Sequence, residues 1–82
     1  MFKNKNDGNN NICGMQIYNL RKSSKIKMSQ RILAEKMQLA GIDMDKNAIQ
    51  RIECGKRFVT DIELAAFAKI FGVSCDYLLG IK

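Results

Sequence analysis

Apolar residues recur at intervals of three and four positions from residue 15 to the end of the chain. In the stretch 29–41, for example, Leu33, Met37 and Ala40 fall at i, i+4 and i+7. This spacing places side chains on one face of an α-helix, and it never alternates for long enough to indicate a β-strand. The pattern therefore predicts an all-α fold.

Local start and stop signals divide the pattern into five short helices. The first begins near Met15 and fades in the Ser- and Lys-rich stretch 23–27. Each of the other four follows a residue whose side-chain oxygen can accept a hydrogen bond from an unpaired backbone N–H, and each precedes a glycine. In chain order the caps are Ser29, Asp45, Thr60 and Ser74, and the glycines are Gly41, Gly55, Gly72 and Gly80. Thr60 and Glu63 have the spacing of a capping box. We therefore expect a compact five-helix bundle.

Residues 1–14 have a different composition. They are rich in Asn, Lys and Gly and predict a disordered N-terminal arm. The rest, 15–82, is expected to form one domain, because a chain of 82 residues is too short for two cores.

Composition excludes several classes of protein. The chain has three cysteines, no C-x-x-C pair and no histidine, so we expect no enzyme activity, no bound metal and no cofactor. Apolar runs are far shorter than the roughly 18 residues of a membrane span, and the first residues lack the apolar stretch of a signal peptide. These features predict a cytoplasmic protein with free thiols and no membrane partner.

Charge is distributed unevenly. The formal net charge is +6, and residues 16–41 contribute +5 of it, whereas residues 58–82 carry −1. Such asymmetry is typical of a protein that meets a polyanion with one face, although a solvated basic surface has the same composition.

The stretch 45–53 is predicted to form a helix with one polar face. With Ile49 and Ile52 inward, its outward positions are polar, namely Lys46, Asn47, Gln50 and Arg51. A helix fits the major groove, and these side-chain types match the donors and acceptors of base edges. An ordinary solvated helix would carry similar residues, so this pattern alone leaves both interpretations open.

Four motifs in order make the interpretation more specific. They are Ile17-x-x-Leu20-Arg21, Met28-Ser29-Gln30-x-x-Leu33-Ala34-Glu35-Lys36-Met37, Ile49-x-Arg51-Ile52-Glu53-x-Gly55-Lys56-Arg57 and Leu64-x-x-Phe67-Ala68-Lys69-x-Phe71-Gly72-Val73-Ser74-x-Asp76-Tyr77-Leu78-Leu79-Gly80. Together they resemble the phage-repressor and Cro (XRE-type) helix-turn-helix family over about 65 of the 82 residues.

This resemblance implies a lambda-repressor-like DNA-binding domain whose second and third helices form the helix-turn-helix. It further implies a small prokaryotic or phage transcriptional regulator, usually a repressor. Such a protein binds double-stranded DNA sequence-specifically, as a homodimer on a palindromic site.

The resemblance also assigns roles to individual positions. Base-reading side chains are expected at Lys46, Asn47, Gln50 and Arg51, with Arg51 suited to a two-fold contact with guanine. Phosphate-binding side chains are expected at Gln30, Lys56 and Arg57. A structural ion pair is expected between Arg21 and Glu53. The connection between the second and third helices is longer than in compact phage repressors, with the second helix reaching Ala40.

Two alternatives remain open. The same fold can serve as a protein-interaction module, such as an antitoxin or an adaptor. Cys54, beside several cations, is either an inert surface thiol or a redox sensor.

Phe58 and Tyr77 are the candidate positions for contact with a second subunit.

Overall fold

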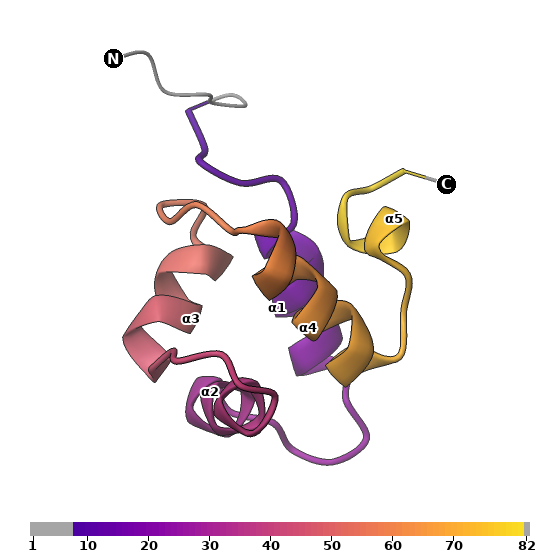
Figure 1. Ribbon diagram of the computed structural model, residues 1–82. Helices are drawn as coiled ribbons and strands as arrows, with labels where there is room; N and C mark the ends of the chain where they lie inside the picture. The colour runs from indigo at the N-terminus through magenta and orange to yellow at the C-terminus, as the bar shows by residue number, and fades with distance from the viewer. Residues whose placement is uncertain (1–7, 82) are drawn as a thin grey trace.

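The computed structural model describes residues 8–81, in which five helices pack into a bundle (Figure 1). The helices are α1 (Gly14–Lys22), α2 (Gln30–Leu39), α3 (Lys46–Glu53), α4 (Asp61–Phe71) and α5 (Cys75–Leu78). No strand occurs among these residues, so the predicted all-α class is confirmed for them. None of the helices within 8–81 has the length and apolar character needed to cross a bilayer.

The four predicted helix caps are all present. The side chains of Ser29, Asp45 and Ser74 accept hydrogen bonds from backbone N–H groups three residues later, at 3.1, 2.8 and 3.0 Å. At the start of α4, Glu63 N–H donates to Thr60 Oγ1 and Thr60 N–H donates to Glu63 Oε1, which completes the capping box. Local sequence thus determines where α2, α3, α4 and α5 begin.

The connection from α2 to α3 turns at Gly41, whose φ of 88° lies in the left-handed region that glycine adopts without strain. α2 ends at Leu39 with Ala40 as its C-cap, one residue before the predicted end at Ala40. The turn is then held by Gln38, whose Nε2 donates to the carbonyl of Met44 at 3.0 Å. This bond links the last turn of α2 to the residues just before α3.

The core contains one or more side chains from every helix. The fully buried apolar residues of these helices are Ile17, Leu33, Met37, Ile49, Ile52, Phe67 and Leu78. Ala40, expected on the inward face, is exposed instead, because α2 ends there and the chain turns away. Ile49 and Ile52 anchor α3 in this core, and this anchoring determines which face of α3 meets solvent.

The N-terminal segment differs from the expected disordered arm. Residues 1–7 lie outside the described part of the chain, but residues 10–13 pack against the end of α3. The Asn10 backbone N–H donates to Gly55 O at 2.7 Å, and Cys13 is only 2% exposed. The physical reason is that backbone carbonyls at the end of α3 and in the turn after it accept hydrogen bonds, and Asn10 and Asn11 supply the donors.

Candidate nucleic-acid interface

The exposed face of α3 contains the four predicted base-reading residues. Lys46 and Gln50 lie one turn apart, as do Asn47 and Arg51, so the two pairs form adjacent rows. All four residues are exposed, whereas Ile49 and Ile52 on the opposite face have no exposed surface. In Figure 1, α3 lies at the left edge of the bundle with α2 below it. The face that could meet a ligand is therefore entirely polar or cationic.

The free cations can be separated from the paired ones. Within residues 8–81, the ion pairs involve Arg21, Arg31 and Arg57. Lys46, Arg51 and Lys56 are exposed and have no ion-pair partner in that part of the chain. Their charge is thus available to an anionic ligand.

The predicted ion pair between Arg21 and Glu53 is present and buried. Arg21 Nε donates to Glu53 Oε2 at 2.7 Å and Nη2 donates to Oε1 at 3.0 Å, with the two side chains only 9% and 4% exposed. The hydrogen bond with Glu53 raises the pKa of Arg21 above its already high usual value. Arg21 Nη1 also donates to the carbonyl of Met28, just before α2. A single guanidinium thus links α1, the entry to α2 and the last turn of α3.

Gln30, the first residue of α2, belongs to the same network. Its Nε2 donates to Glu53 Oε1 at 3.0 Å. This contact leaves the second amide hydrogen and the side-chain oxygen of Gln30 for other partners. The predicted phosphate-binding residue therefore also connects α2 to α3 directly.

Arg57, expected to bind phosphate, forms an ion pair within the protein. Its Nη1 and Nη2 donate to the two carboxylate oxygens of Glu63 at 3.0 and 3.1 Å, and Nη1 also donates to Phe58 O. Burial raises the pKa of Glu63, but the hydrogen bonds from Arg57 and from the Thr60 backbone outweigh that effect, so the pKa lies below its usual value. The charge of Arg57 is balanced by Glu63, and a contact of Arg57 with phosphate stays a prediction.

Sequence reasoning missed the asparagines that fasten the end of α3. Asn11 Nδ2 donates to the carbonyls of Ile52 and Arg57 at 3.1 and 2.7 Å, and its Oδ1 accepts from Gly14 N–H at 2.8 Å. Asn10 Nδ2 donates to the carbonyl of Lys56 at 2.9 Å. The only available signal was the run of three asparagines at 9–11. These bonds fix the backbone that carries Lys56.

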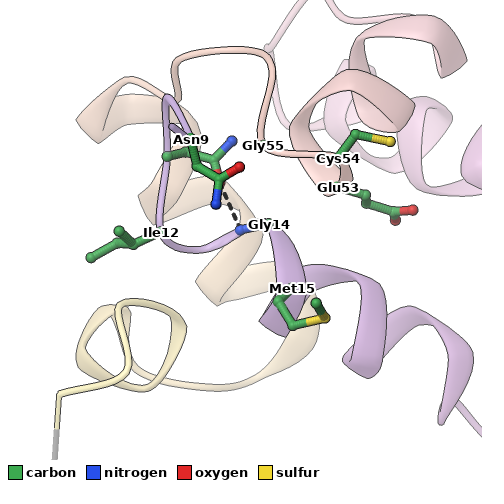
Figure 2. A pocket seen from close by; sticks show the side chains of 8 residues that line it. Asn9, Ile12, Gly14, Met15, Glu53, Cys54 and Gly55 are labelled. Carbon is green, nitrogen blue, oxygen red and sulfur yellow. Dashed lines mark hydrogen bonds between the residues drawn. The ribbon is translucent and has the colours of Figure 1, made fainter. Parts of the chain in front are cut away.

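A small pocket of about 200 Å³ lies between this segment and the end of α3. Figure 2 shows Asn9 beside Gly55, Cys54 next to Glu53 at the end of α3, and Met15 on the first turn of α1. Its lining includes one carboxylate, Glu53, which is already paired with Arg21. The pocket therefore offers no free charged group to a ligand.

The three cysteines, all within the described residues, are free. Cys54 is exposed and Cys75 half-buried, whereas burial raises the pKa of Cys13 to about 11. Cys13 is therefore a thiol, and not a thiolate, at neutral pH. Residues 8–81 contain no cluster of three or more Cys, Asp or Glu side chains that could hold a metal ion.

Comparisons with protein-family models, with curated proteins and with solved structures find no match for this chain.

Proposed function

We propose that this protein binds double-stranded DNA sequence-specifically and acts as a small transcriptional regulator, with repression as its effect. One observation carries the proposal. The face of α3 opposite its buried isoleucines consists of exposed side chains that suit base edges, and its two cations have no ion-pair partner within residues 8–81.

In this proposal α2 and α3 act as a helix-turn-helix, and α3 enters the major groove. Arg51 donates two hydrogen bonds to O6 and N7 of a guanine. Asn47 and Gln50 have amides that match the N6 and N7 positions of adenine. Lys46, at the first turn of α3, contacts a guanine or a nearby phosphate. The four side chains together specify a short half-site.

Phosphate contacts flank the reading helix. Lys56 follows α3, and its backbone carbonyl accepts a hydrogen bond from Asn10. Its exposed side chain has no ion-pair partner within residues 8–81, so its ammonium is available for one sugar-phosphate strand. On the other side, the N-terminus of α2 offers the backbone N–H of Gln30, which an anion can accept. These contacts add affinity with little preference for sequence.

The Arg21–Glu53–Gln30 network supports this function indirectly. It joins α1, α2 and α3 through hydrogen bonds of 2.7–3.0 Å. A reading helix held rigidly loses less conformational entropy on binding than a mobile one. The network thus fixes the angle between α2 and α3 before DNA arrives.

The proposal includes pairing of two copies on a palindromic site, with half-sites about 34 Å apart. Phe58 and Tyr77, each 47% exposed, are the apolar side chains we assign to this contact.

Selection of bound duplexes from a random pool at about 150 mM salt tests the proposal, because non-specific binding is weak at that ionic strength. We expect an enriched motif of two inverted half-sites. Recovery of unenriched duplexes, or of none, would contradict sequence-specific binding.

A further inference from the structure

A second surface lies between α2 and α4, separate from the α3 face. Here the C-terminal half of α2 and the second half of α4 line a shallow, open groove of about 550 Å³. Its apolar lining consists of Leu39, Ala40, Ala65, Ala66 and Ile70. No residue of α3 contributes to this groove, so binding here leaves the candidate reading helix uncovered.

The apolar surface of the groove is unusually accessible. Leu39 is 89% exposed although it belongs to a helix that packs on the core. Ile62 of α4, one turn before Ala66, is also 68% exposed. Contiguous apolar surface bordered by polar residues marks sites of protein contact.

Charge identifies the kind of partner. The groove is bordered by Lys36 of α2 and Lys69 of α4, and none of its lining residues is acidic. A second copy docked symmetrically on the same groove would bring the four lining lysines of the two copies together, with no acidic residue among the lining residues. A partner with acidic groups beside an apolar stripe complements both features of the groove.

We propose that this groove binds an acidic amphipathic helix of another protein. Apolar side chains at i, i+3 or i+4 and i+7 of that helix cover Leu39 and the alanines of α4. Glutamate or aspartate side chains on its flanks pair with Lys36 and Lys69. A DNA-bound copy can then carry the partner, which makes the protein an adaptor as well as a DNA binder.

Two synthetic helical peptides test this inference. Both carry the same stripe of leucines, but one has glutamates and the other has lysines on its flanks. Each is titrated into the full chain while backbone amide NMR signals are recorded. We expect the acidic peptide to shift the signals of Leu39, Ala65, Ala66 and Ile70 and the basic peptide to bind at least about tenfold more weakly, since two solvent-exposed charge pairs change from attraction to repulsion.

Substitutions separate the apolar and charged contributions. Leu39→Glu should abolish binding of the acidic peptide, whereas the matched change Ile26→Glu, at a residue that is 82% exposed outside the groove, should leave it unchanged. The double variant Lys36→Glu, Lys69→Glu should prefer the basic peptide. Leu39 and Ile26 both lie on the surface, so both glutamate variants are expected to fold.

Equal binding of the two peptides, shifts that map elsewhere, or no shifts would overturn the inference. So would sedimentation data in which the wild type forms a dimer and Leu39→Glu a monomer, because the occupant would then be a second copy. The titration contains no DNA, so its failure is distinguishable from failure of the proposed DNA binding.

Discussion

Lys56 and Arg57 are neighbours in the sequence, yet their cationic groups have different surroundings. Lys56 is exposed with no ion-pair partner in residues 8–81, whereas the guanidinium of Arg57 is paired with Glu63. Net charge alone treats the two residues alike. Their side-chain contacts predict that only Lys56 binds a polyanion.

The two residues should therefore respond differently to truncation. Lys56→Ala should weaken binding to all duplexes alike and reduce the log–log salt slope by about one, because one phosphate contact is lost. Arg57→Ala should instead lower the free energy of unfolding by about 1–2 kcal/mol, between the values for exposed and buried ion pairs. Fluorescence-anisotropy titrations at several salt concentrations and chemical denaturation measure the two effects. Equal loss of affinity in both variants would show that Arg57 also contacts phosphate.

Glu63 gives stability a specific dependence on pH. Its pKa is lower in the folded than in the unfolded chain, so the unfolded state takes up the proton first as the pH falls. The stabilisation is complete above the unfolded value of about 4.3 and is lost as the pH falls through the lower folded value.

Replacement of Glu63 by Gln removes this titration while the amide can still cap α4. We expect Glu63→Gln to be less stable than the wild type at pH 7 and to approach it near pH 3, measured by denaturation at both pH values. Asp61→Asn, which changes an exposed carboxylate in the same turn, is the control and should show a smaller difference. A stability difference for Glu63→Gln that stays constant with pH would contradict the proposed role of its ion pair.

At the level of helices, the sequence predicted the starts of α2, α3, α4 and α5, because each cap bonds an N–H only three residues away. It did not predict the fastening of α3 by asparagines, since Asn11 is separated by 41 and 46 residues from the carbonyls that it contacts. From composition alone, residues 10–13 were predicted to belong to a disordered arm. Likewise, the sequence predicted that Glu63 caps α4. It did not predict the ion pair of Glu63 with Arg57, because the turn between α3 and α4 has to bring the two side chains together.

The packing of α1 on α3 depends on the absence of a side chain at Gly14. A Cβ added there would collide with the backbone carbonyl oxygen of Ile52. Gly14→Ala should thus push the two helices apart and cost roughly 1–3 kcal/mol, the range for overpacked sites. Thermal denaturation checks this, with Met15→Ala as control, since Met15 is 67% exposed in the same turn. If Gly14→Ala proved as stable as Met15→Ala, then α1 and α3 would be able to move apart and accept the added Cβ without strain.

For the whole molecule, the uneven charge predicts how binding responds to salt. Most of the net charge of +6 comes from residues 16–41, which include α2 and the loop before it. If each subunit contacts about five phosphates, the slope of log affinity against log salt should be roughly −4 to −5 per subunit. Titration of a selected duplex between low and physiological salt measures this slope. A slope near zero would be incompatible with a cationic DNA-binding face.

The central claim is that the exposed face of α3 reads bases. Its most direct test is a cycle that combines Arg51→Ala with replacement of the guanine that the selected site presents to it. Wild type should lose about 1–3 kcal/mol on the altered duplex, whereas Arg51→Ala should bind the original and altered duplexes almost equally. If Arg51→Ala keeps the full preference of the wild type at every base pair of the site, Arg51 does not read bases and α3 is not the reading helix proposed here.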